Sequence, residues 1–255
     1  SFGAFSGPPE YAASVFMILA ALPFVRYVQM INGQANPLVS DSQVRAFLGT
    51  IAILVVVTAA VLVSIFPHHP EQAVREALFN ITSIISGTGY ASVDYMKWGS
   101  FLIMVFFFVG LIGGCAGSTS CSVKIFRYQL FFAAINAQIR RIHSPHGVFS
   151  TRYEGRTVGE DVLSSVMSFF VLFIVSLGFL SVALGLTGLD FITSVSGAAS
   201  ALANIGPGLG PIIGPAGNVA NLNDSAKWLL AAAMLIGRLE LLVVYAIFTV
   251  NFWKD

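Results

Sequence analysis

The chain has 255 residues, of which 56% are hydrophobic and only 10% are charged, whereas roughly a quarter of the residues of a soluble domain are charged. With 22 Phe residues and a mean hydropathy of +0.82, the chain carries more apolar surface than one globular core can bury, which excludes a water-soluble fold and predicts contact with lipid. The net charge of +1 argues against nucleic acid as a partner, because binding it requires a strongly basic surface.

Apolar stretches predict the membrane-spanning helices. A hydrocarbon core of about 30 Å takes about 20 helical residues. Four stretches reach that length, namely 11–31, 45–66, 162–186 and 228–253. A fifth, 98–112, is equally apolar but runs into Gly and Ser before it can have crossed, and 121–141 then resumes with basic residues. We therefore predict a broken helix whose second half leaves the membrane.

Two further stretches, 72–86 and 190–204, are semi-apolar and too short to span. Each lies between two spanning helices and ends at a glycine-containing turn, which is the pattern of a re-entrant hairpin. The order helix, re-entrant segment, helix thus occurs twice, in 45–141 and in 162–253. The predicted fold is an all-α integral membrane protein built from repeated, K⁺-channel-like helix–P-loop–helix units, with re-entrant pore helices and one broken helix.

The basic residues predict the orientation in the membrane. If the connection 121–161 is cytoplasmic, nine Lys and Arg residues lie on that side, and only Arg75, Lys97 and Lys227 lie on the other. This distribution obeys the positive-inside rule. We therefore expect 121–161 in the cytoplasm and both re-entrant segments entering from outside. Arg238 remains alone inside a predicted span.

The chain just after each re-entrant helix is a candidate ion site. Irregular backbone at membrane depth is tolerated only where protein buries it or where it lines water. Thr88-Gly89-Tyr90 and the run from Ile205 to Gly208 can turn successive carbonyl oxygens to one side, and several such strands around an axis can replace the hydration shell of K⁺. The alternative is a pair of interfacial turns in which Gly and Pro merely end helices.

The interruption of the broken helix also contains glycines and hydroxyl groups. It comprises Gly113, Gly114, Cys115, Ala116, Gly117, Ser118, Thr119 and Ser120, and we call it loop 113–120. The glycines provide hinges, and the hydroxyl groups can bond to backbone groups that the break frees. A plain kink between packed helices is the alternative. A nucleotide phosphate loop is disfavoured because no Gly-Lys-Ser/Thr follows.

Four motifs, in order, resemble those of the Trk/Ktr/HKT superfamily of potassium transporters, most closely the bacterial Trk-type pore subunit. They are Thr88-Gly89-Tyr90, loop 113–120, Asn204-Ile205-Gly206-Pro207-Gly208 and Gly237-Arg238-Leu239-Glu240. The resemblance implies four helix–P-loop–helix repeats in one polypeptide around one pore, and a homodimer of such polypeptides. This chain holds only repeats three and four, so we expect it to be a piece of a longer protein that needs the other repeats to close a pore.

The resemblance also implies three parts of the chain. Residues 1–44 would be the last helix of a preceding repeat and a cytoplasmic loop. Residues 45–160 would be the third repeat, with the intramembrane loop and a cytoplasmic extension. Residues 161–255 would be the fourth repeat.

By resemblance, the filter has one key glycine in each repeat, here Gly89 and Gly206. The filter carbonyls would belong to Thr88, Gly89, Tyr90, Asn204, Ile205, Gly206 and Pro207, with K⁺ itself at Thr88, Gly89, Ile205 and Gly206. We call residues 88–90 the first filter segment and residues 204–207 the second filter segment. Loop 113–120 would lie beneath the filter and obstruct the pathway.

Arg238 is predicted near the middle of the span 228–253. A charge at that depth normally faces the bundle interior or a water-filled path, so we expect the Arg238 side chain to point inward, with the freed carbonyls of loop 113–120 as its partners. The alternative is a purely structural pair.

These patterns together predict K⁺ uptake across the inner membrane without covalent chemistry, and hence a protein that is not an enzyme. The lipid bilayer is the partner that composition predicts, K⁺ is the transported ion and no cofactor is expected. The family resemblance further implies two protein partners, namely a second copy of the chain and a cytosolic nucleotide-binding regulatory subunit on the basic segment 124–156. One rival is an alternating-access secondary transporter for Na⁺ or another substrate. A membrane-embedded enzyme is disfavoured because no catalytic cluster has a recognisable spacing.

Overall fold

The computed structural model describes residues 2–33, 36–66, 69–144, 147, 149–239 and 241–253. The described chain is almost entirely helical. The first part contains α1 (Pro8–Ala20), α2 (Phe24–Ile31), α3 (Asn36–Ser40), α4 (Ser42–Ile65), α5 (Pro70–Ser86), η1 (Tyr95–Trp98), α6 (Ser100–Leu111) and α7 (Ile125–His143). The hairpin β1 (Arg152–Tyr153) and β2 (Arg156–Thr157) then leads to α8 (Glu160–Leu186), α9 (Phe191–Ala203), η2 (Val219–Asn221), α10 (Asp224–Arg238), α11 (Leu241–Ile247) and η3 (Val250–Trp253).

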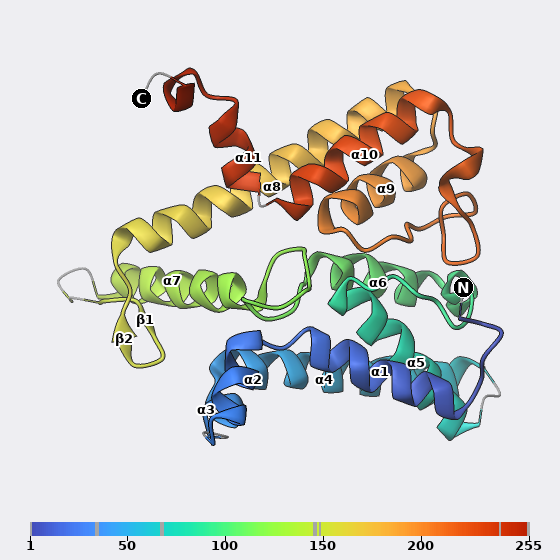
Figure 1. The fold of residues 1–255 in the computed structure, drawn as a ribbon, viewed down its shortest axis with the longest axis horizontal. Helices are drawn as coiled ribbons and strands as arrows, with labels where there is room; N and C mark the ends of the chain where they lie inside the picture. Colours follow the sequence, from blue (N-terminus) through green and yellow to red (C-terminus); the bar gives the residue numbers. More distant parts are fainter. Residues whose placement is uncertain are drawn as a thin grey trace.

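The helices form three layers (Figure 1). Helices α1, α2, α4 and α5 make one outer layer, and α8, α9 and α10 make the other. Helix α6, the loop after it and α7 lie between the two, since α6 contacts both α5 and α9 while α7 contacts both α4 and α8. The broken helix is therefore the element that joins the two halves of the chain.

Two helices among the described residues, α4 and α8, are long and apolar enough to cross a membrane alone. They confirm the predicted spans 45–66 and 162–186. The predicted spans 11–31 and 228–253 are each a bent pair of helices rather than one straight helix: α1 and α2 meet at 91°, and α10 and α11 at 106°. Pro23 explains the first break, since proline lacks an N–H group and disfavours helical backbone in the residue before it. Gly237, a poor helix former, precedes the second.

The predicted re-entrant helices are present as α5 and α9. Helix α5 starts at Pro70, a favoured first helical residue, and ends at Gly87. Helix α9 starts after Asp190, whose carboxylate accepts a hydrogen bond from the Thr193 amide, and ends at Asn204, which has a left-handed conformation with φ of 53°. From Phe79 of α5 and Thr193 of α9 onward, both helices are almost entirely buried, as short helices at membrane depth must be.

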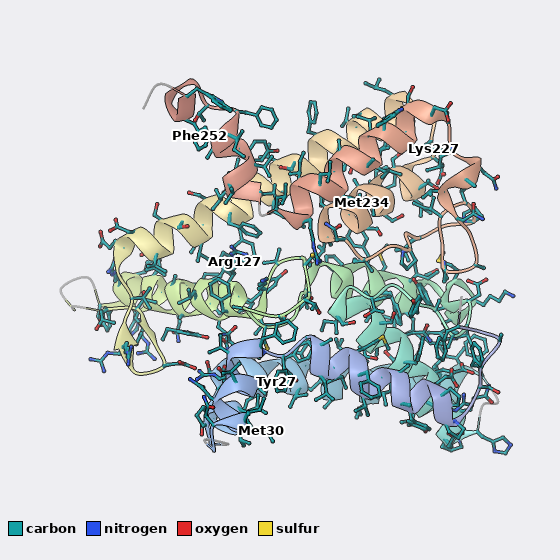
Figure 2. The ribbon with its side chains drawn as sticks, in the orientation of Figure 1. Tyr27, Met30, Arg127, Lys227, Met234 and Phe252 are labelled. Carbon is teal, nitrogen blue, oxygen red and sulfur yellow. The ribbon has the colours of Figure 1, made fainter. Side chains whose placement is uncertain are left out.

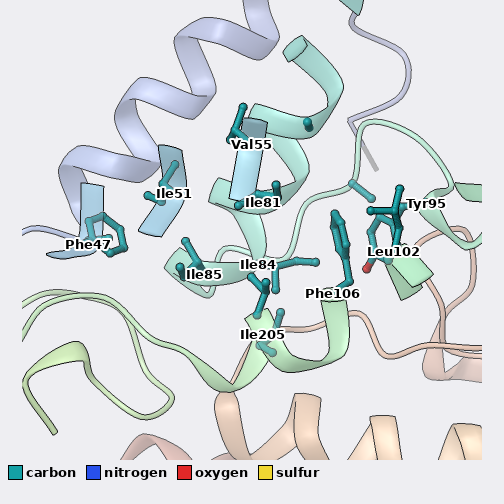
Figure 3. Close-up of a cluster of buried hydrophobic side chains, with 14 of the residues drawn as sticks. Phe47, Ile51, Val55, Ile81, Ile84, Ile85, Tyr95, Leu102, Phe106 and Ile205 are labelled. Atoms are coloured by element: carbon teal, nitrogen blue, oxygen red, sulfur yellow. The ribbon is translucent and has the colours of Figure 1, made fainter. Parts of the chain in front are cut away.

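The larger core lies between α4, α5 and α6 (Figure 3). Phe47 and Ile51 of α4 pack towards Ile81 and Ile85 of α5. The side chain of Ile205, from the opposite half of the chain, inserts into the same cluster. This contact fixes the end of α9 against α5 and α6, and with it the relative position of the two filter segments.

The break between α6 and α7 is confirmed, although α7 begins at Ile125 rather than at residue 121. Ile112 and Val123 form an isolated parallel bridge across the base of the break. The Gly113 amide donates to the Val123 carbonyl at 2.9 Å, and the Ile125 amide donates to the Gly114 carbonyl at 3.1 Å. These bonds close the interruption into a ring with a defined neck.

A buried ion pair attaches α1 to α5. The Glu10 carboxylate, 3% exposed, pairs with the Arg75 guanidinium, 13% exposed, and also accepts a hydrogen bond from the Gly7 amide. A carboxylate this deeply buried is strongly destabilising without its cationic partner.

We expect Arg75→Ala to lower the stability of the complete polypeptide by about 3 kcal/mol, because it leaves the Glu10 carboxylate buried and unpaired. Adding Glu10→Gln should recover part of the loss. Thermal unfolding in detergent measures both, with Lys227→Ala, which breaks a solvent-exposed pair with Asp224, as the control. Equal effects of Arg75→Ala and Lys227→Ala would contradict the structural role of the buried pair.

Candidate ion pathway

The first filter segment leaves the end of α5 with its amides already bonded. The amides of Thr88 and Gly89 both donate to the carbonyl oxygen of Ser83, at 2.9 and 3.2 Å. The hydroxyl groups of Ser86 and Thr88 lie 2.8 Å apart. Because the amides point back to the helix, the carbonyl groups of this segment are free to point away from it.

The second filter segment leaves α9 in a similar way. The Ile205 amide donates to the carbonyl of Ser200 at 3.0 Å, and the Gly206 amide donates to the Ser200 hydroxyl oxygen at 3.2 Å. The Asn204 side-chain amide donates to the Met234 carbonyl of α10 at 3.0 Å. Ser83 and Ser200 thus occupy corresponding places below the two segments.

The two filter segments meet each other. A Cβ atom on Gly89 would overlap the carbonyl oxygen of Ile205 and would lie 3.0 Å from the ring of Pro207. Gly206 adopts φ of 114°, a conformation that only glycine takes without strain. The structure therefore brings together the glycines that the sequence singled out, although they are far apart in the chain.

The residues of the two filter segments differ in exposure. Thr88, Tyr90 and Gly206 are exposed in this chain, whereas Ile205 is buried in the core. The Tyr90 ring lies 6.3 Å from the ring of Phe2. Ile205 therefore presents its backbone carbonyl, and not its side chain, to Gly89.

Loop 113–120 satisfies much of its own backbone with its hydroxyl groups. The Ser118 hydroxyl donates to the Cys115 carbonyl at 2.6 Å. The Ser120 hydroxyl accepts from the Gly114 amide at 2.8 Å and contacts the Ile85 carbonyl at 3.3 Å. Through Ser120 the loop reaches the last turn of α5, directly before the first filter segment.

The break between α1 and α2 supplies the main external anchors of the loop. The Cys115 amide donates to the Ala21 carbonyl at 3.0 Å, and the Phe24 amide donates to the Gly117 carbonyl at 3.0 Å. The Thr119 hydroxyl donates to the Ala20 carbonyl at 3.0 Å. Backbone freed at one helix break is thus bonded to backbone freed at another.

Helix α4 adds one more anchor, which the sequence does not reveal. The Ala116 amide donates to the side-chain oxygen of Gln43 at 2.9 Å. Gln43 stands among other polar residues at the start of α4 and gives no sign of its partner, so neither Gln43 nor the carbonyls at 20–21 could be assigned. Pro23 was the available signal for the break itself.

Arg238 contacts the loop, but from the end of a helix rather than its middle. Its guanidinium donates to the Thr119 carbonyl at 3.3 Å and to the Cys121 sulfur at 2.9 Å. The expected partners were the freed carbonyls of loop 113–120, and the carbonyl that the guanidinium meets is that of Thr119 in this loop. Arg238 is exposed in this chain, and Glu240 of the same motif lies outside the described residues.

A cavity of about 240 Å³ lies beside these contacts. It is lined by Ser118, Thr119, Ser120, Lys124, Arg127 and Arg238, among others. The Arg127 guanidinium stacks over the Phe169 ring of α8 at 3.9 Å, and Figure 2 shows Arg127 between α7 and α8. The cavity is therefore bordered by the loop, the start of α7 and α8, and cationic side chains line it.

Three acidic residues next to short helices and at the start of α10 have local structural partners. Asp94 accepts a hydrogen bond from the Met96 amide, and Asp224 pairs with Lys227 at 3.3 Å. The hydrogen bond with Thr193 lowers the pKa of Asp190 below its usual value. These residues act first as helix caps and surface pairs.

Known proteins match this chain over nearly its whole length. The family model described as TrkH, cation transport protein, matches residues 1–254. The Trk system potassium uptake protein TrkI of Halomonas elongata is 41% identical over 258 residues, covering all of this chain and 52% of that protein. The Trk system potassium uptake protein TrkH of Salmonella typhimurium is 31% identical, covering all of this chain and 53% of that protein.

A solved structure agrees over nearly the entire chain. The crystal structure of the potassium transporter TrkH from Vibrio parahaemolyticus matches with a TM-score of 0.93 at 29% identity, covering 99% of this chain and 55% of that one. This likeness confirms the predicted membrane-protein fold. The chain spans about half the length of the curated relatives it matches.

Proposed function

The chain belongs to the TrkH family of cation transport proteins, and we propose that it supplies half of a pore for K⁺ uptake within a longer polypeptide. Residues 45–160 and 161–255 each contribute one helix–P-loop–helix repeat, and residues 1–44 end the repeat before them. The names of the related proteins, which are potassium uptake proteins, support the choice of ion.

One observation carries the proposal: the two glycine-containing segments meet. The Ile205 carbonyl lies against Gly89 so closely that a side chain at Gly89 would displace it. Each segment follows a re-entrant helix that bonds its amides. Carbonyl oxygens from several such segments around one axis can replace the water shell of a dehydrated K⁺ ion, and two more segments from the rest of the polypeptide would complete the ring.

Loop 113–120 is the gate in this proposal, and Arg238 holds it closed. The Ser120 contact with the end of α5 supports a position of the loop just beneath the filter. The Arg238 guanidinium bonds to the loop and brings a positive charge next to the path of a cation. Both effects oppose K⁺ flow, so opening requires these bonds to break.

The same proposal includes the location, the orientation and the protein partners of the pore. The pore lies in the inner membrane as part of a homodimer, with 121–161 on the cytoplasmic side. There the basic end of α7 and the β1–β2 hairpin offer a surface for a cytosolic nucleotide-binding regulatory subunit. Lys124, Arg140, Arg141, Arg152 and Arg156 give this side its positive charge.

We expect Gly89→Ser and Gly206→Ser to reduce the K⁺ over Na⁺ flux ratio of the complete polypeptide about tenfold or more. The first would push the Ile205 carbonyl out of place, and the second would strain the backbone. Ion flux into proteoliposomes measures the ratio. Gly178→Ser, at a position on α8 with open space around it, is the control. Unchanged ratios in both folded variants would overturn the filter assignment, and saturable flux coupled to an ion gradient would favour an alternating-access transporter.

We expect deletion of residues 116–118 to raise K⁺ flux several-fold and to reduce its dependence on a cytosolic partner. The deletion removes the tip of the loop but leaves Gly114 and Ser120, which bond to each other across its base. Flux assays with and without cytosolic extract test this expectation. Loss of flux in a well-folded deletion variant would instead favour a packing kink.

We expect Arg238→Ala to increase K⁺ flux with little change in the K⁺ over Na⁺ ratio, because it removes the bonds to Thr119 and Cys121 and a local positive charge. Arg238→Lys should give a K⁺ flux between that of Arg238→Ala and that of the native protein. Arg45→Ala, which removes an exposed charge from α4, controls for the change in net charge. Decreased flux with altered ion preference would assign Arg238 to the support of the filter.

A further inference from the structure

Helix α5 holds the chain beyond the first filter segment with one buried side chain. The Asn80 side-chain nitrogen donates to the Ser92 hydroxyl oxygen at 2.9 Å, and the Ser92 amide donates back to the Asn80 side-chain oxygen at 3.2 Å. Asn80 is fully buried, and the same nitrogen also donates to the Glu76 carbonyl at 2.8 Å. Asn80 is thereby fixed both to its own helix and to the outgoing chain.

Helix α9 makes a corresponding pair of bonds with a different side chain. The Ser196 hydroxyl donates to the Leu209 carbonyl at 3.1 Å and accepts from the Leu209 amide at 2.9 Å. Ser196 is 4% exposed. One side chain again exchanges two hydrogen bonds with one residue of the outgoing chain.

The two held residues occupy the same position relative to the filter. Ser92 is three residues after Gly89, and Leu209 is three residues after Gly206. The amide of Asn80 and the hydroxyl group of Ser196 each hold the third residue after the filter glycine. They do so from helix positions that differ by one residue between the two repeats, since the glycines are 117 positions apart and Asn80 and Ser196 are 116 positions apart. Satisfying a buried polar group explains one such bond pair, but it does not explain why both pairs end at the third residue after the glycine.

The position matters because it fixes the second end of each filter segment. The first end is fixed by the bonds of the Thr88, Gly89 and Ile205 amides to the preceding helix. Without Asn80 and Ser196, the outgoing end would lose its bond to that helix. A segment held at both ends cannot move its carbonyl oxygens inward, and an ion smaller than K⁺ would need that movement to replace its water shell.

We propose that Asn80 and Ser196 are positioning residues that set K⁺ discrimination by holding the outgoing ends of the two filter segments. The inference rests on the proposed pore function. It assigns ion preference to two residues that lie behind the filter and do not contact the ion.

The test uses the complete polypeptide in proteoliposomes, with the K⁺ over Na⁺ flux ratio as the readout. Ser196→Ala removes a single oxygen atom, and Ser196→Thr retains the hydroxyl group. Asn80→Leu removes both bonds to Ser92 at similar volume. We expect Ser196→Ala and Asn80→Leu each to lower the ratio about threefold to tenfold, as the loss of one or two hydrogen bonds predicts, and Ser196→Thr to restore most of it.

Matched controls come from the same two helices. Ser194→Ala removes a buried hydroxyl of α9 that donates to the Leu189 carbonyl before the helix at 3.4 Å. Thr82→Val removes a fully buried hydroxyl of α5 that bonds to carbonyls of its own helix. Both controls should leave the flux ratio unchanged while lowering thermal stability to a similar degree.

The outcomes separate this inference from the function on which it rests. If the native protein passes K⁺ selectively and Gly89→Ser abolishes the preference, but Ser196→Ala and Asn80→Leu change only the melting temperature, the positioning role is wrong. If the native protein shows no selective K⁺ flux, the proposed pore function itself is wrong, and the positioning role falls with it. If Asn80→Leu does not fold, Ser196→Ala with its Thr rescue decides alone, because it is the smallest change available.

Discussion

Backbone amides and carbonyls at membrane depth need a partner inside the protein unless they line water, and this constraint organises the chain. Helices α4 and α8 satisfy this constraint with the backbone hydrogen bonds inside each helix. The irregular parts meet it by bonding to one another: the loop amides of Cys115 and Ala116 take their acceptors from the α1–α2 break and from Gln43. The filter segments take theirs from the helices that they have just left. Loop 113–120 therefore lies in the middle layer of the molecule, where the break in an outer layer can bond to it.

Much of this fold follows from the sequence because apolar length and helix punctuation are local properties. The long helices, the two short re-entrant helices and the break after Leu111 lie close to where composition predicts them. Gly89 and Gly206 stand out because each closely follows a short, semi-apolar helix, where only glycine lets the chain turn back without strain, and the structure brings them together. A family resemblance then joined these local features into one arrangement, and comparison with related proteins confirms the family.

Other features depend on contacts between distant parts of the chain, and the sequence could not supply them. A run of apolar residues does not reveal a right-angle turn, so the spans at 11–31 and 228–253 were expected to be single helices. Arg238 was expected mid-helix for the same reason, and its bonds to Thr119 and Cys121 cross more than a hundred residues of sequence. The partners of Asn80 and Ser196 depend on how tightly each outgoing strand folds back, which periodicity does not encode.

The neck formed by Ile112 and Val123 has a kinetic consequence for the loop. Because the neck closes residues 113–122 into a small ring, a displaced loop keeps both ends in place and searches only a restricted volume before it returns. Closing a ring of that size takes about 10–100 ns in a free chain, and its entropy cost is modest. If the loop is the proposed gate, its opening rate would then be limited by the rupture of its bonds to Ala20, Ala21, Gln43 and Arg238, and no rearrangement of α6 or α7 is needed.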